Sequence, residues 1–354
     1  MDKMNEQAVG IDVSKAKLDI CVISGEKLKT KVLSNTATGH GELLRWLSQR
    51  KLAADTPIVL EATGPYSESV AIALADAGWA VSVVNPARVA GFAQSELSRN
   101  KTDRADAKLL ARFAQRAALV VWEPPSEAVR ELRALVDRLQ ALIDMRQQEL
   151  NRLEALEQGP AANVSAMVKE HVAWLDEQIR KLQGSIDDHI DGHPELKQDA
   201  QLMQSIPGIG NRTAAQFLAY IGDVRRFKSA KALAAFIGVS PKQKQSGTSI
   251  KGRTVISRAG HTAARKALYM PGLVATRHNP VIIALAKRLQ HKGLAPKAIV
   301  GASMRKLVHL IYGVIKSGQP FQAEIPLRAL EIQEGISNRD PEPRTPNRVT
   351  PNRA

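Results

Sequence analysis

Four acidic side chains, Asp12, Glu61, Asp103 and Asp106, are placed where they could bind metal ions together in an otherwise basic chain. Asp12 lies in one apolar run and Glu61 ends another, so both occupy expected buried strands. Asp103 and Asp106 are spaced i, i+3 at the start of a helical stretch and share one helix face. Clustered carboxylates repel one another unless cations hold them, and hard oxygen ligands favour Mg²⁺ or Mn²⁺. Two such ions can clamp the attacking and leaving oxygens of a phosphodiester, so the quartet predicts nuclease-type chemistry.

Each of these acids also has a structural explanation when it is taken alone. Asp12 could cap a turn, Glu61 could pair with a lysine, and Asp103 or Asp106 could serve as a negative charge at a helix N-terminus. Their joint placement at one edge of a predicted sheet favours the metal site.

Ser246 is the second candidate for chemistry. It precedes Gly247 in a cation-rich segment, where a serine can approach a phosphate and act as a nucleophile once a base or metal activates it. Taken alone, a Ser-Gly pair in a loop is more often a turn. The cations expected to contact phosphates are Lys242, Lys244, Lys251, Arg253, Arg258, Arg265, Lys266, Arg305 and Lys306.

The elements that must position the acids follow an α/β pattern over residues 1–121. Strands are expected at 8–13, 17–24, 28–33, 57–61 and 79–84, and helices near 41–50, near 66–77 and from 102 onward. The first three strands form a meander, and the later ones alternate with helices and so need parallel crossovers. This is the pattern of the ribonuclease H-like fold, in which the first and fourth strands are neighbours. That arrangement would bring Asp12 next to Glu61, with the last helix carrying Asp103 and Asp106 to the same edge.

A helical region is expected at 122–200. Ser126 is a plausible N-cap, and apolar residues follow 3 and 4 spacing to about 157, as in a long amphipathic helix or coiled coil. Gly159-Pro160 breaks this stretch, and a second apolar stripe runs from Val168 to Ile186. The two stripes could pack on each other as a helical hairpin or mediate dimerisation.

A mainly helical region follows at 201–323. Its first motif, Ile206-Pro207-Gly208-Ile209-Gly210, resembles a helix-hairpin-helix element, in which Gly208 and Gly210 would direct backbone N–H groups at a DNA phosphate. Such a turn can also be simply a tight helix junction. Residues 245–252 are expected to form a flexible segment, and residues 324–354 a disordered tail.

Composition and charge limit the possible functions. The 354 residues contain no apolar run near the roughly 20 residues of a membrane span, no signal-peptide pattern and one cysteine, so a cytoplasmic protein without disulfides is expected. The net charge is +15, and residues 224–323 hold 19 Lys or Arg and no Asp or Glu. An acid-free stretch of this length suits a polyphosphate partner, although a soluble cationic surface or a membrane-contacting patch would look the same.

Two sets of motifs resemble the IS110-family transposases, including the IS1111-like branch. The N-terminal set is Gly10-Ile11-Asp12-Val13-Ser14-Lys15, Glu61-Ala62-Thr63-Gly64 and Lys101-Thr102-Asp103-Arg104-Ala105-Asp106-Ala107. The C-terminal set, in the family's order, is Ile206-Pro207-Gly208-Ile209-Gly210, Phe227-Lys228-Ser229, Gly238-Val239-Ser240-Pro241, Gln245-Ser246-Gly247 and Ser257-Arg258-Ala259-Gly260-His261. The resemblance covers about residues 8–320.

This resemblance implies a RuvC-like DEDD domain at 1–121, a coiled-coil oligomerisation region at 122–200 and a C-terminal transposase domain at 201–323. It implies a recombinase that excises and inserts its element through circular intermediates, guided in some members by a structured bridge RNA. The four acids would bind Mg²⁺, and Ser246 would attack DNA to form a phosphoserine link, with Ser249 as the second choice. The family often has Asn where this chain has His261. Members act as tetramers with shared active sites, so a dimer or tetramer is expected.

Three other functions compete with this reading. A Holliday-junction nuclease would use the same carboxylates with water as nucleophile and would not need Ser246. An actin-like sugar kinase or ATPase would need glycine-rich phosphate loops downstream, and none is evident. A non-catalytic regulator that binds DNA or RNA would not need acids at all four places.

Overall fold

The computed structural model describes residues 5–53, 55–62, 64–96, 103–156, 162–242, 245–246, 250–251 and 255–324. The chain divides into two compact units, Met1–Pro125 and Ser126–Ala354. The region expected to be helical therefore falls in the same unit as the basic region that follows it.

The first unit is built on a five-stranded sheet of order β3-β2-β1-β4-β5. Its elements are β1 (Gln7–Val13), β2 (Lys17–Ser24), β3 (Lys27–Ser34), α1 (Ala37–Ser48), β4 (Ile58–Glu61), α2 (Pro65–Asp76), β5 (Val81–Val84), α3 (Pro86–Ser95) and α4 (Asp103–Arg116). The first three strands are antiparallel, and β4 pairs in parallel with β1 and with β5. The predicted meander and the predicted pairing of the first and fourth strands are confirmed, in an arrangement that fits a ribonuclease H-like domain.

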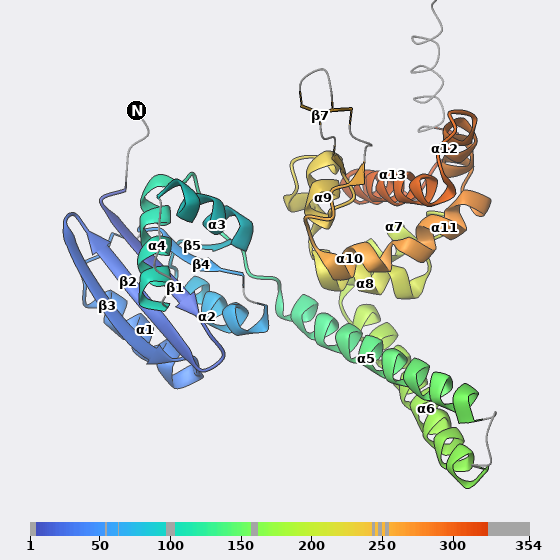
Figure 1. Cartoon of the computed structure of the whole chain (residues 1–354), viewed down its shortest axis with the longest axis horizontal. Coiled ribbons are helices and arrows are strands. Elements are labelled where there is room, and N and C mark those ends of the chain that lie inside the picture. The colour runs from blue at the N-terminus through green and yellow to red at the C-terminus, as the bar shows by residue number, and fades with distance from the viewer. Residues whose placement is uncertain are drawn as a thin grey trace, which may run out of the picture. The chain divides into compact units, whose positions relative to one another are not determined.

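Helices cover both faces of this sheet. Because side chains alternate along a strand, Val9 and Ile11 of β1 point to one face, where they share a core with residues of α1 and α2. Ala8 of β1 and Val59 of β4 point to the other face and pack with residues of α3 and α4. Figure 1 shows α4 lying across the strands on this second face.

Helix α1 begins earlier than the sequence predicts. Its N-cap is Thr36, whose side chain accepts a hydrogen bond from the Gly39 amide at 3.2 Å. A β-branched residue and a glycine in the first turn are weak helix formers, which is why the expected helix began only near residue 41. The cap and the packing of α1 on the sheet override that propensity.

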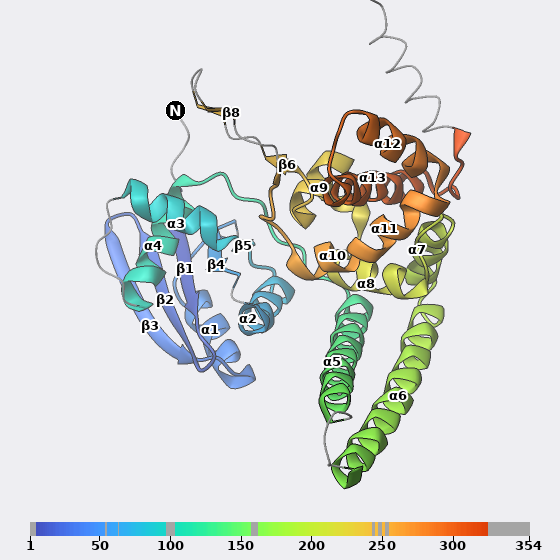
Figure 2. The ribbon, with the colours of Figure 1, turned by 45° about the vertical axis from the view of Figure 1, so that its right-hand side comes forward.

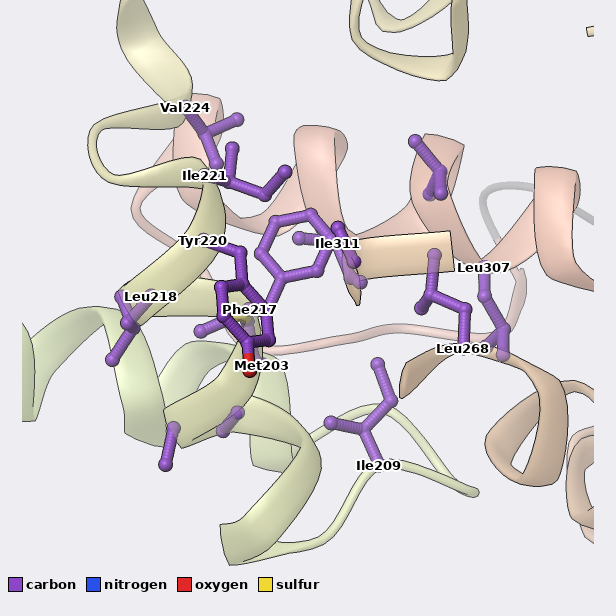
Figure 3. Packing of buried hydrophobic residues seen from close by; sticks show 14 of the residues in the cluster. Met203, Ile209, Phe217, Leu218, Tyr220, Ile221, Val224, Leu268, Leu307 and Ile311 are labelled. Atoms are coloured by element: carbon purple, nitrogen blue, oxygen red, sulfur yellow. The ribbon is translucent and has the colours of Figure 1, made fainter. Parts of the chain in front are cut away.

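The second unit is mostly helical. Its elements are α5 (Glu127–Leu156), α6 (Ala162–Asp191), α7 (Pro194–Gln204), α8 (Asn211–Ile221), η1 (Val224–Arg226), α9 (Ala230–Ile237), β6 (Pro241–Lys242), β7 (Gln245–Ser246), β8 (Ile250–Lys251), β9 (Val255–Ile256), α10 (Thr262–Ala267), α11 (Tyr269–His278), α12 (Pro280–His291) and α13 (Pro296–Ser317). One core runs from the first turns of α5 to α13. Figure 3 shows part of it, with Phe217 and Tyr220 of α8 near Ile311 of α13.

Helices α5 and α6 pack against each other as a hairpin, as one of the two sequence alternatives predicts (Figure 2). Ser126 caps α5, accepting a hydrogen bond from the Val129 amide at 3.3 Å, as expected. The predicted break at Gly159-Pro160 lies outside the described residues.

Two further expectations change. Helix α13 is long and apolar enough to cross a membrane by length and composition alone, although no such run was expected; 56% of its apolar window is buried, as in the core helix of a globular domain. The segment 245–252 was expected to be a flexible loop, yet its described residues form paired strands, β7 and β8. The predicted tail lies outside the described residues except for Glu324 at its start.

Candidate active site

Asp12 and Glu61 lie side by side on neighbouring parallel strands. The β1–β4 register pairs Ile11 with Leu60, so the residues that follow them are Asp12 and Glu61. Both side chains are half-buried. Glu61 is two residues after Val59, which packs against α4, so alternation directs it to the same face of the sheet.

The contact between α4 and the sheet is closest at Gly10. A side-chain carbon at Gly10 would lie 2.2 Å from the Ala111 nitrogen and 2.3 Å from the Ala107 oxygen, so only glycine lets the two backbones approach this closely. Since position 10 faces α4, Asp12 two residues later faces it too. The two acids therefore lie beneath this helix.

Helix α4 runs antiparallel to β1, which places its first turn beside Asp12. Near the start of β1, Asn5 bonds to the carbonyls of Gln115 and Ala114 at the end of α4. Gly10 then meets the middle of α4, so the end of β1 lies toward the helix N-terminus. Asp106 is half-buried in that first turn, one turn before Leu110, which packs on the sheet.

The structure places Asp12 and Glu61 on adjacent strands at the face that α4 covers, and Asp106 in the first turn of α4. The fourth, Asp103, starts α4, but its side chain lies outside the described set. Among the described side chains, no group of three His, Cys, Asp or Glu is close enough to hold an ion. The donor set is nonetheless of the right kind, since half-buried carboxylate oxygens at a strand end suit a hard divalent cation. Asp12, Glu61 and Asp106 are the described acids on this face that could contribute such oxygens.

A fifth acid, Asp19, was missed by the sequence analysis. It is the cross-strand partner of Asp12 on β2, is only 6% exposed, and forms an ion pair with Lys17, Nζ to Oδ2 3.1 Å. An acid between Leu18 and Ile20 in an otherwise buried strand was the signal that could have identified it. The pair adds both a negative and a positive charge next to the predicted site.

Ser246 lies in the second unit, on a narrow antiparallel arm. In this arm Pro241 pairs with Ile256, and farther out Ser246 pairs with Ile250. The arm's base is fixed to the helices, because Ile256 fills the space where a side chain at Gly301 would lie. Neither unit by itself contains both this serine and the carboxylates. Ser249, Lys244 and Arg253 lie outside the described residues, as does the side chain of Lys251.

A second close contact aligns the chain after the arm. Gly260 has φ +147°, and a side-chain carbon there would lie 2.4 Å from the Phe236 oxygen. The next residue, His261, caps α10 by accepting a hydrogen bond at Nδ1 from the Ala264 amide, 3.2 Å. Burial, followed by the positive charge of Arg133, lowers the pKa of His261, which favours the neutral ring that this cap requires.

The predicted helix-hairpin-helix turn links α7 to α8. Gly208 has φ +104°, and a side-chain carbon there would lie 3.1 Å from Cβ of Ala275 on α11. Glycine at 208 is therefore explained by packing within the unit. Gly210 is the N-cap of α8, has open space around it, and leaves the first amides of the helix without a side-chain cap. A helix N-terminus without a side-chain cap favours a nearby negative charge.

The other predicted phosphate contacts differ in their surroundings. Lys242 is exposed on β6, and Arg258 is exposed with a left-handed φ of 57°. Arg265 donates to the Ile237 carbonyl at 3.1 Å and to Thr262 Oγ1 at 3.2 Å, so its guanidinium already joins α9 to α10. Burial, followed by the charge of Arg288, lowers the pKa of Lys306 on α13.

Comparison with known proteins bears on both units. Residues 9–158 match the IS110 DEDD family, described as a transposase, and residues 200–287 match the family described as "Transposase IS116/IS110/IS902 family". The "Pilin gene-inverting protein" of Moraxella bovis is 33% identical over 324 residues, covering 91% of this chain and 99% of the relative. The chain belongs to the IS110 family of transposases.

Other relatives place the transposase in the same group. The "Transposase for insertion sequence element IS1111A" of Coxiella burnetii is 24% identical over 298 residues, covering 76% of this chain and 78% of the relative. The IS110 "uncharacterized 43.6 kDa protein" of Streptomyces coelicolor is 26% identical over 152 residues, covering 43% and 36%. The protein is therefore a DNA-binding transposase or recombinase, and its family generally uses divalent metal ions.

Proposed function

We propose that this transposase cuts and rejoins DNA strands at two sites, with divalent ions held by Asp12, Glu61, Asp103 and Asp106 and with Ser246 as nucleophile. The observation that carries the metal part is the adjacency of Asp12 and Glu61 beneath α4. Mg²⁺ is the expected ion and Mn²⁺ its usual substitute, because both prefer carboxylate oxygens.

The chemistry requires no external energy source. Bound divalent ions would polarise the phosphodiester and stabilise charge on its oxygens. Ser246 Oγ forms a bond to phosphorus as it loses its proton, while the bond from phosphorus to a sugar oxygen breaks and that oxygen takes up a proton. In the rejoining step a sugar hydroxyl of the exchange partner attacks the phosphoserine, and Ser246 Oγ leaves. One phosphodiester is consumed and one is made.

A bridge RNA is proposed as a second nucleic-acid partner. The transposase is proposed to act in the cytoplasm, where both DNA and RNA are available. Residues 224–323 carry 19 cations and no acids, which supports phosphate contacts beyond those needed at one cleaved strand. The uncapped N-terminus of α8 supports one of these contacts. Adding or omitting RNA from the element's flanking region in the assay below tests this partner.

Oligomerisation is proposed to use the α5–α6 hairpin, with the coiled-coil geometry expected of two long apolar stripes. Met145 of α5 and Val164, Met167 and Trp174 of α6 are exposed, and Met167 is 70% accessible. Exposed large apolar side chains on a long hairpin support association with a second copy. Light scattering on the wild type and on Met167→Glu should show a smaller assembly in the variant, whereas an unchanged mass would exclude this surface.

The test of the nucleophile is a denaturing gel of transposase incubated with labelled element-junction DNA, flanking RNA and Mg²⁺. A covalent protein–DNA band is expected in the wild type and absent in Ser246→Ala and in Asp12→Asn. Ser249→Ala, three residues away in the sequence, is the matched control, and it should retain the band. If the band were lost in Ser249→Ala but kept in Ser246→Ala, Ser249 would be the nucleophile.

The runner-up function is a Holliday-junction nuclease that uses water. It predicts cleaved DNA without an adduct, undiminished by Ser246→Ala and abolished by Asp12→Asn. The identity to a protein named for pilin gene inversion favours rejoining, since inversion requires that cut strands be sealed in a new order. A plasmid with two inverted junction sites separates the two functions, because only a recombinase would yield the inverted circle.

A further inference from the structure

One amide side chain links the turn that follows Asp12 to the first turn of α2, the helix that follows Glu61. Asn35 lies between the end of β3 and the N-cap of α1. Its Nδ2 donates to the Ser14 carbonyl at 2.9 Å and to the Tyr66 carbonyl at 3.0 Å. Ser14 comes two residues after Asp12, and Tyr66 lies in the first turn of α2, directly after the loop that begins at Glu61.

The β1–β2 turn that Asn35 holds is itself rigid. Ser14 Oγ donates to the Lys17 carbonyl at 2.9 Å and accepts from the Lys17 amide at 3.1 Å. The backbone amide of Asn35 adds a bond to the Ala16 carbonyl at 3.0 Å. Asn35 therefore binds the turn after Asp12 at two points, and its remaining side-chain donor reaches the start of α2.

His40 on α1 fixes the orientation of this amide. Because Nδ2 faces two carbonyls, Oδ1 of Asn35 is the acceptor, and His40 Nε2, 2.8 Å away, must carry the hydrogen. His40 is 8% exposed, and burial lowers its pKa, so the ring is held neutral with its proton on Nε2. The flipped amide would set its oxygen against the Ser14 and Tyr66 carbonyls, so only one orientation satisfies all three partners.

The support under Asn35 is also rigid. A side-chain carbon at Gly39 would lie 1.9 Å from the Ser34 carbonyl oxygen, so the first turn of α1 is pressed directly on the end of β3. The joint that carries Asn35 is therefore closed by a direct backbone contact between the two elements. An amide on such a joint can hold the turn after Asp12 and the start of α2 at a fixed separation.

We propose that Asn35, oriented by His40, is a positioning residue that sets the separation between the turn after Asp12 and the start of α2 after Glu61, and thereby the affinity of the carboxylate site for a divalent ion. The inference rests on the proposed role of those two carboxylates. Asn35 itself does not bind the ion, because both donors and its acceptor are already used. Its effect on the ion is indirect: it restricts where the carboxylates of Asp12 and Glu61 can lie, as residues that hydrogen-bond to metal ligands do.

The experiment is Mn²⁺ binding to the full-length transposase, measured from the free-ion EPR signal, without DNA. Asn35→Ala should weaken binding by about 10- to 100-fold, the usual effect of removing a support of metal ligands. His40→Leu should have the same direction of effect, and His40→Gln should restore much of the affinity, since a glutamine amide can donate where Nε2 does. Thr36→Ala is the matched control: it removes the α1 cap one residue away but touches neither the turn after Asp12 nor the start of α2.

Each outcome decides between the possibilities. Weaker Mn²⁺ binding in Asn35→Ala and His40→Leu, with Thr36→Ala and His40→Gln near wild type, supports the inference. Unchanged binding in Asn35→Ala, with binding lost in Asp12→Asn, overturns the positioning role and leaves the carboxylate site intact. Unchanged binding in Asp12→Asn shows that the proposed carboxylate site is itself wrong. If Asn35→Ala does not fold, the two His40 variants still test the proposal. Equal affinities of His40→Leu and His40→Gln for Mn²⁺ would overturn it.

Discussion

The closest backbone contact in the candidate site gives the sharpest prediction. Gly10→Ala adds one methyl group to β1 where α4 crosses it. That carbon would lie 2.2 Å from the Ala111 nitrogen and 2.3 Å from the Ala107 oxygen, and both of these are backbone atoms that no rotamer change can move. The helix as a whole has to retreat.

The size of the effect follows from these distances. Ordinary contacts of a side-chain carbon begin near 3.4 Å, so α4 must move by about 1 Å or the strand must bend. Overpacking of this kind costs about 1–3 kcal/mol of stability. The same movement carries Asp106 away from Asp12 and Glu61, and a misplacement of about 1 Å can cost on the order of 100-fold in rate.

Two measurements test this prediction together. Urea denaturation gives the free energy of unfolding, and single-turnover cleavage of junction DNA at saturating Mg²⁺ gives the rate. Gly91→Ala is the matched control, since Gly91 lies on α3 in the same unit and a methyl group there meets nothing within 4 Å. That variant should gain about 0.5–1 kcal/mol and keep its rate.

A folded Gly10→Ala protein with the wild-type rate would refute the reasoning. It would mean either that α4 does not need its close approach or that Asp106 does not act with the strand acids. A loss of stability with no loss of rate in the remaining folded fraction would separate these: the contact would be real, but the helix would carry no part of the site.

Three further predictions concern the second unit. Arg225→Met should lower the free energy of unfolding by about 1–3 kcal/mol, because the buried Asp199 carboxylate loses hydrogen bonds of 2.7 and 2.9 Å; an unchanged urea midpoint would contradict this. Burial, followed by a hydrogen bond to a carboxylate, raises the pKa of Tyr220. Above pH 10.0 the folded state therefore keeps a proton that the unfolded chain releases. The free energy of unfolding should fall above that pH, and it should fall less steeply in Tyr220→Phe. Because the pKa of His261 is lowered in the folded state, its contribution to stability is present above pH 6.5 and is lost as the pH falls through the folded pKa. His261→Asn can still accept the hydrogen bond from the Ala264 amide, so thermal denaturation should show a smaller loss of stability in acid than in the wild type. An identical loss in both proteins would exclude this role for the cap.

The main features of the sheet could be predicted from sequence because they depend on periodicity and connection rules. Three closely spaced strands must form a meander, and a strand between helices must run parallel to its neighbour, so Asp12 and Glu61 had to meet. Asp19 and Asn35 were not predicted, because their roles depend on a cross-strand register and on hydrogen bonds from one connection to a turn and to a helix elsewhere in the chain. A local sequence pattern predicts neither the register nor these hydrogen bonds.

The arm that carries Ser246 marks a different limit of sequence reasoning. Its strands are two residues each, which is too short for any alternation of apolar and polar residues to be recognised. The glycine and serine content of 245–252 therefore predicted a flexible loop. The pairing of Ser246 with Ile250, like that of Pro241 with Ile256 15 positions away in the chain, depends on a register that no local pattern shows.

The order of the site's elements along the chain has a consequence during protein synthesis. The meander can form from the first 34 residues, but β4 joins β1 only after residue 61, and α4 crosses the sheet only after residue 116. At a ribosomal rate of about 5–20 residues per second, the last of these comes on the order of 10 s after the first codon. Asp12 and Glu61 are therefore both synthesised well before the helix that packs over them. A chain that ended in that interval would lack α4, and with it two of the four predicted acids, Asp103 and Asp106.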